Sequence, residues 1–131
     1  MFIDRLLNQG NAPLLEQVVQ FTSVRHRLIA ENIANVDTPG YRQKDLSVSG
    51  FQKALRDRVD RRRAGAMVRF DDVQGEAENP MQGILFHDRN NRSMEQLTTD
   101  MAKNAMMHNL AIEILRKQYL TMETALKERI A

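Results

Sequence analysis

Apolar side chains near the start of the chain recur at steps of three and four residues, the spacing of one face of an α-helix. The pattern predicts an amphipathic helix over residues 13 to 35, with its apolar stripe interrupted at Arg25 and His26. Pro13 suits the first turn of this helix, because the N–H group that proline lacks would have no partner there. The stripe consists of Leu14, Leu15, Val18, Val19, Phe21, Leu28, Ile29 and Ile33.

The last part of the chain has a stronger helical pattern, from residue 93 to about residue 129. Ser93 and Gln96 have the spacing of a capping box, which marks the start of a helix. Beyond them, a set of residues repeats every seven positions, as is typical of a coiled-coil seam. The repeat consists of Met94, Met101, His108, Leu115 and Met122, with Leu97, Ala105, Ile112, Tyr119 and Leu126 between them.

The two predicted helices differ in length, and the difference indicates assembly. The second would be about 55 Å long and the first about 33 Å at about 1.5 Å per residue, whereas a compact globule of this chain length is roughly 35 Å across. We therefore expect apolar surface that other chains must cover. The residues expected to form this assembly seam are Leu14, Val18, Leu28, Ile29, Ile33, Leu97, Met101, Ile112, Leu115, Tyr119, Met122 and Leu126.

The middle of the chain, about residues 42 to 90, has the weakest pattern. Residues 47–50 are predicted as a short extended piece and residues 51–63 as a weak helix. Alternating apolar positions near 67–70 and 84–86 predict two short strands, which we expect to form a small hairpin.

The predicted fold is therefore mainly α, with long N- and C-terminal helices that pair as a coiled-coil hairpin. Residues 1–41 and 92–131 would form one discontinuous helical domain. Residues 42–91 would form an irregular or β-hairpin segment that projects from the helical pair, since it is too small for a core of its own.

Composition excludes several classes of function. The 131 residues include 19 Lys and Arg against 17 Asp and Glu, so the net charge of +2 does not imply bulk attraction to nucleic acid. The arginine-rich run at 56–63 is interrupted by Asp57 and Asp60 and lacks interleaved aromatic residues. Its positive charge and the acidic residues after it can form a solvated, self-compensating surface or set register between neighbouring subunits.

Candidate chemistry is equally sparse. The chain has no cysteine, and His26, His87 and His108 share no metal-ligand spacing. His108 falls in the seven-residue repeat, where a packed, hydrogen-bonded histidine is expected. No catalytic, cofactor or metal site is predicted, and no segment has the length of a membrane span or the form of a cleaved secretory signal. On the residues alone, this favours a cytoplasmic protein.

The string Asn-Ile-Ala-Asn-Val-Asp-Thr-Pro-Gly-Tyr at 32–41 stands where the first helix ends. Asn35 tolerates the left-handed conformation that often follows a helix. Thr38 is pushed towards an extended conformation by the following proline, and Pro39 and Gly40 suit the two central positions of a type II turn. By chemistry alone, this string ends a helix in a tight turn.

Together with the preceding Leu-Ile-Ala-Glu at 28–31, the string resembles the amino-terminal signature of the flagellar axial proteins, the rod and hook family of the bacterial flagellum. The resemblance covers roughly residues 14–46 and 90–126, and within the family it is greatest for the short proximal rod proteins. The residues that match the family's turn motif are Asn32, Asn35, Thr38, Pro39, Gly40 and Tyr41.

The resemblance implies a non-enzymatic structural subunit of the rod, a rigid tubular drive shaft. The implied partners are copies of the chain, other rod proteins, the membrane-supramembrane (MS) ring, the adaptor protein FliE and the flagellar type III export apparatus. The implied location is the periplasmic rod of the basal body, reached without a cleaved signal peptide. The turn motif would fix the angle at which the middle part leaves the helices, with Tyr41 packed at the corner.

The helical pattern alone also allows a different protein, a cytoplasmic helical hairpin that dimerises into a four-helix bundle and acts as an adaptor. Both proteins would use the same apolar stripes, so periodicity does not separate them. The turn string favours the rod subunit.

Overall fold

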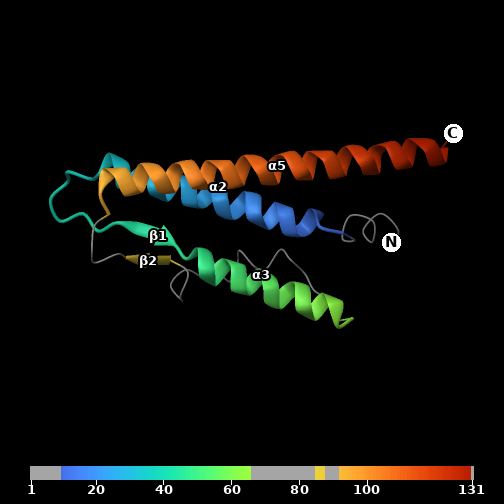
Figure 1. Cartoon of the computed structure of the whole chain (residues 1–131), viewed down its shortest axis with the longest axis horizontal. Coiled ribbons are helices and arrows are strands. Elements are labelled where there is room, and N and C mark those ends of the chain that lie inside the picture. The colour runs from blue at the N-terminus through green and yellow to red at the C-terminus, as the bar shows by residue number, and fades with distance from the viewer. Residues whose placement is uncertain (1–9, 66–84, 88–91, 131) are drawn as a thin grey trace.

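The computed structural model describes residues 10–65, 85–87 and 92–130. Two long helices, α2 (Ala12–Ala34) and α5 (Met94–Ile130), lie side by side and run in opposite directions (Figure 1). With 23 and 37 residues they are about 35 Å and 55 Å long. The carboxyl-terminal part of α5 therefore continues past the first turn of α2 (Figure 1). The prediction of a mainly α fold built on paired terminal helices is confirmed.

The ends of the two long helices follow the local sequence. Pro13 lies in the first turn of α2, and the amide of Leu15 donates to the carbonyl of Asn11 at 2.9 Å. At the start of α5, the Ser93 amide donates to Gln96 Oε1 at 3.2 Å and the Gln96 amide donates to Ser93 Oγ at 3.3 Å. This reciprocal pair is the predicted capping box.

The turn after α2 differs from the prediction at one residue. Asn35 has φ −109°, so the expectation of a left-handed residue there is wrong. Its amide still donates to Glu31 O at 3.1 Å, so the helix ends without a left-handed cap. The type II turn is confirmed: Gly40 has φ +75°, and the Tyr41 amide donates to Thr38 O at 3.2 Å.

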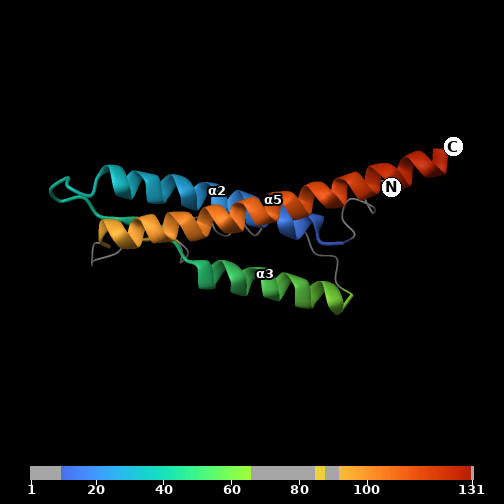
Figure 2. The same ribbon diagram turned by 45° about the horizontal axis from the view of Figure 1, so that its top comes forward.

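A third helix, α3 (Val48–Arg63), begins three residues earlier than predicted. The extended piece expected at 47–50 is wrong, because Ser47 Oγ accepts from the Gly50 amide at 3.0 Å and so caps a helix. This helix also does not project freely. The rings of Phe51 and Phe21 stack with centroids 4.0 Å apart, within a core cluster that includes Leu28 and Leu46. Figure 2 shows α3 running alongside the helical pair.

The sheet consists of two short strands far apart in the sequence. Strand β1 (Lys44–Leu46) pairs antiparallel with β2 (Leu85–His87), with Asp45 opposite Phe86. The predicted strand near 84–86 is thus present and pairs with β1, a strand that the sequence had not predicted. The other predicted strand, at 67–70, lies outside the described residues.

Candidate functional site

The turn after α2 is attached to the helix through the side chain of Asn32, which is 1% exposed. Its Nδ2 donates to Lys44 O at 2.7 Å, and its Oδ1 accepts from the Lys44 amide at 3.0 Å. The Tyr41 hydroxyl donates to the same Oδ1 at 3.4 Å. The buried Asn32 side chain thus bonds both the carbonyl and the amide of Lys44. Because Lys44 is the first residue of β1, these bonds fix the direction in which the strand leaves the turn.

The outer part of the turn motif has a different environment. Asn35 Nδ2 donates to Glu31 O at 2.9 Å, and Thr38 Oγ1 donates to Asn35 Oδ1 at 3.2 Å. These local bonds hold the turn from within. Thr38, Pro39 and Gly40 are exposed, so this tip of the hairpin is open to solvent or to a partner.

A second polar group beside the turn is centred on Asp45, whose side chain is 4% exposed. Its carboxylate accepts from Arg25 Nε at 3.0 Å and Nη2 at 3.2 Å, from Arg92 Nη1 at 2.7 Å, and from the Leu46 amide at 2.7 Å. The Arg92 Nη1 also donates to Asp100 at 2.9 Å. The interruption of the apolar stripe at Arg25 is explained by this ion pair.

Arg92, two residues before α5, is held through its main-chain groups by the side chain of Gln43, the residue before β1. Gln43 Nε2 donates to Arg92 O at 3.0 Å, and the Arg92 amide donates to Gln43 Oε1 at 2.8 Å. Together with Asp45, this joins α2, β1 and the start of α5 into one buried polar network. Sequence reasoning missed Asp45 and Gln43, because their partners are 47 to 49 residues away along the chain.

The contact between α2 and α5 follows the seven-residue repeat, but with one column displaced from the prediction. The α5 residues that are buried or half-buried along α2 alternate in steps of four and three, as in a seam. They are Leu97, Met101, Asn104, His108, Ala111, Leu115, Gln118 and Met122. The second column therefore continues from Leu97 through Asn104, Ala111 and Gln118. The sequence had predicted Ala105, Ile112 and Tyr119, each one position later, and of these only Ala105 is half-buried.

The residues expected to form the assembly seam fall into three groups. Leu28, Ile29 and Leu97 are buried, and Ile112, Tyr119 and Leu126 are 39–40% exposed along the flank of α5. The remaining six are half-buried: Leu14, Val18, Ile33, Met101, Leu115 and Met122. Leu28 belongs to the core cluster with Phe21, Leu46 and Phe51, and Val18 packs against it, so the chain's own fold covers part of the predicted seam.

A further apolar stripe lies on the face of α5 that is turned away from α2. Met106 is 72% exposed, Leu110 61%, Met107 45% and Ile114 41%. Leu110 lies four residues after Met106, three after Met107 and four before Ile114, so it shares one side of the helix with each of them. All large exposed apolar side chains that the structure describes belong to α5. We call Met106, Met107, Leu110 and Ile114 the outer stripe.

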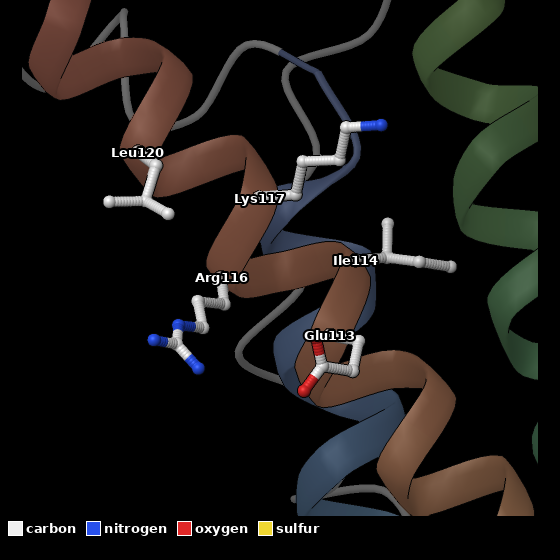
Figure 3. Close-up of a pocket in the computed structure, with 5 residues that line it drawn as sticks. All are labelled: Glu113, Ile114, Arg116, Lys117 and Leu120. Carbon is white, nitrogen blue, oxygen red and sulfur yellow. The ribbon is translucent and has the colours of Figure 1, made fainter.

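Figure 3 shows how open this side of α5 is. The shallow depression there is lined only by Glu113, Ile114, Arg116, Lys117 and Leu120, whose side chains spread outwards from successive turns of one helix (Figure 3). Ligand pockets are usually concave sites that bury most of the ligand's surface. This depression is instead a mixed apolar and charged surface, the form expected of a contact with another macromolecule.

Ionisable groups give no sign of a reaction centre in the parts of the chain that the structure describes. There, no three His, Asp or Glu side chains lie close enough to hold a metal ion. Tyr119 donates a hydrogen bond to Glu16, and this bond, desolvation and the carboxylate charge together raise the pKa of Tyr119 to about 12. Among the described helices, none is long and apolar enough to cross a membrane.

Two known proteins are similar to this chain over about nine-tenths of its length. No protein-family model matches the chain. The chain is 26% identical over 117 residues to the flagellar basal body rod protein FlgB of Aquifex aeolicus, covering 88% of this chain and 92% of that protein. It is 25% identical over 126 residues to FlgB of Bacillus subtilis, covering 92% and 95%. These similarities extend over nearly the whole chain and support a flagellar rod protein family.

Proposed function

We propose that this chain is a structural subunit of the proximal rod of the flagellar basal body, equivalent to FlgB, and that it has no enzymatic activity. In the proposal, the terminal helices pack with copies of the chain and with other rod proteins to form a rigid tube. The MS ring, FliE and the export apparatus are its further partners. The subunit reaches the periplasmic rod without a cleaved signal.

The observation that carries this proposal is the distribution of apolar side chains around α5. The side towards α2 is filled, with Leu97 at 0% and Ala111 at 4% exposure, yet the opposite side carries Leu110 at 61% and Met106 at 72%. A helix that is apolar on both sides is expected in the interior of a larger structure. Fully burying one such side chain stabilises a contact by about 1.5–3 kcal/mol, so covering the outer stripe favours association.

The exposed face of α2 lacks large apolar side chains, unlike that of α5, and this difference supports the same assignment. Its exposed positions are polar or small, so this face does not demand a partner. They are Glu16, Gln20, Ser23, His26, Arg27, Ala30, Glu31 and Ala34. In the proposal, neighbouring subunits meet chiefly on α5, while α2 and the attached α3 cover its other side.

The experiment is a charge placed in the outer stripe. In the bacterium that carries the gene, Leu110→Asp should abolish swimming and leave basal bodies without a complete rod, while the purified variant keeps its helical content. Asn109→Asp is the matched control, because Asn109 is exposed on the same helix and already polar. That control should swim normally.

Two results would argue against a rod subunit. Normal rods built from Leu110→Asp would remove the assembly role of this face. Retention of the wild-type chain in the cytoplasm, with none in purified basal bodies, would favour the adaptor that dimerises into a four-helix bundle.

A further inference from the structure

The outer stripe has charges of opposite sign at its two ends. Met106 and Leu110 are its most exposed members, at 72% and 61%. Lys103 lies three residues before Met106, Glu113 lies three residues after Leu110, and both charged residues are exposed. Steps of three and four residues keep these four side chains along one side of the helix. Neither Lys103 nor Glu113 is in an ion pair within the part of the chain that the structure describes, so both charges can face another molecule.

The order lysine, methionine, leucine, glutamate is complementary to its own reverse. We consider a second copy of α5 that lies antiparallel to the first, related by a two-fold axis midway between Met106 and Leu110. Met106 then faces Leu110 of the second copy, and Lys103 faces Glu113 of the second copy. Each contact occurs twice, once on either side of the axis, as in any two-fold interface.

Other alignments of the same two helices match less well. In a parallel, in-register pair each residue faces its own copy, so lysine would meet lysine at position 103 and glutamate would meet glutamate at position 113. Such contacts between like charges are unfavourable. An antiparallel pair shifted by one seven-residue repeat would place Leu110 opposite either Thr99 or Glu113. Of these alignments, the centred antiparallel pair is the one that joins apolar to apolar and lysine to glutamate.

We propose that the outer stripe binds a second copy of this chain through an antiparallel pair of α5 helices. Apolar contacts between Met106 and Leu110 stabilise the pair, and the two contacts between Lys103 and Glu113 select its direction and register. A two-fold contact closes on itself and does not extend into a tube. The role of this pair rests on the proposed function: it is the form of the subunit before rod assembly, when the same face has no other neighbour.

The first test reverses the two charges, singly and together. Sedimentation equilibrium of the purified wild-type chain should show monomers and dimers. Lys103→Glu and Glu113→Lys should each raise the dissociation constant of the dimer at least about tenfold, because each variant brings like charges together on both sides of the axis. The double variant restores opposite charges and should return the constant to within about threefold of the wild type.

Lys127→Glu is the matched control for these variants. Lys127 is 74% exposed on the same helix. The two-fold axis relates residue 94, where α5 begins, to residue 122, so position 127 lies beyond the overlap of the two helices. The control should therefore keep the wild-type dissociation constant. Circular dichroism should show the wild-type helical content for all four variants, since every substituted position is exposed.

The second test measures the direction of the pair. The chain has no cysteine, so one spin label can be attached specifically at Thr124→Cys, an exposed position of α5. Residue 124 lies 16 residues from the axis. Two labels in the antiparallel pair are therefore about 48 Å apart along the helices, at about 1.5 Å per residue. A parallel, in-register pair would hold them less than about 20 Å apart. Double electron–electron resonance should show the longer distance.

Three results would overturn the proposal. They are a wild-type chain that stays monomeric at millimolar concentration, a label distance below about 20 Å in the dimer, and a double variant that keeps its helical content but dimerises no better than either single variant. The proposed function is tested separately, by the presence of the wild-type chain in purified basal bodies. A chain that is found there but stays monomeric in solution would overturn the antiparallel pair and leave the rod assignment standing.

Discussion

The two faces of α5 differ in a way that separates folding from assembly. On the face towards α2, large side chains such as Leu97 are buried and the polar ones have partners, as Asn104 and His108 show. On the opposite face, Met106 is 72% exposed and Leu110 61% exposed. The same helix thus has one face that is buried against α2 and another apolar face that is exposed. The comparison indicates that the face towards α2 stabilises the folded monomer, whereas the exposed apolar face determines which other chains the monomer binds.

The largest expected effect comes from placing the same charge on the two faces. Leu97→Asp should destabilise the monomer by about 4 kcal/mol, because it removes a buried apolar group and leaves an unpaired carboxylate inside. Leu110→Asp should change monomer stability by less than about 0.5 kcal/mol, as is usual for exposed sites. Urea denaturation followed by circular dichroism measures both. Equal losses would show that the two faces do not differ as described.

The next effect concerns the polar network that joins the turn to both helices. Asp45→Ala leaves the guanidinium groups of Arg25 and Arg92 without their shared carboxylate, so we expect a loss of about 3 kcal/mol. Asp57→Ala, on the exposed side of α3, is the matched control and should cost about 0.5 kcal/mol or less. If both variants unfold at the same urea concentration as the wild type, Asp45 does not hold the network together.

A smaller effect is expected at the turn. Gly40 has φ +75°, and a Cβ there would meet no atom within 4 Å, so any cost of substitution is conformational and not steric crowding. Gly40→Val should destabilise by about 1–2 kcal/mol. Gly40→Asn should cost less, because asparagine adopts the left-handed conformation more readily. Thermal melting distinguishes them, and identical melting temperatures for Val and Asn would contradict the turn geometry.

The smallest effect concerns Tyr119 and Glu16 on the flank of α5. The pKa of Tyr119 is raised to about 12 in the folded chain, from an ordinary value of 10.0. The folded state therefore keeps a proton that the unfolded chain loses between pH 10 and 12. This contribution to stability is complete below pH 10 and disappears as the pH rises through about 12.

Ultraviolet titration provides the measurement for that pair. The chain has two tyrosines, Tyr41 and Tyr119, so subtracting the titration of Tyr119→Phe from that of the wild type isolates Tyr119. Glu16→Gln should move its midpoint back towards 10. A midpoint that does not respond to Glu16→Gln would mean that the hydrogen bond is absent in solution.

The sequence predicted those elements whose signals are local. The bounds of both long helices, the Ser93–Gln96 capping box and the type II turn at Gly40 all rest on residues within four positions of one another. It missed one local signal at Ser47, whose hydroxyl caps the Gly50 amide and makes the expected extended piece the start of α3. It also missed β1, whose partner strand β2 is about 40 residues away.

The candidate site was predictable to a smaller degree. Met101, His108 and Leu115 of the predicted heptad column lie half-buried, whereas Met94, its first member, is 43% exposed. The other column was displaced by one residue, because side-chain size and hydrophobicity favoured Ile112 over Ala111 and Tyr119 over Gln118. A count of apolar residues gives no weight to polar residues that acquire partners only on another helix, and Asn104 obtains its partner from Thr22.

The most direct test of the central claim is photo-crosslinking in intact basal bodies, with a photoreactive amino acid placed at Met106 or Leu110 and, as the internal control, at Leu97. The account predicts crosslinks from positions 106 and 110 to neighbouring subunits, and crosslinks from position 97 only within the chain, where its side chain is 0% exposed. Absence of intermolecular crosslinks at both outer positions, in basal bodies that contain the protein, would contradict it.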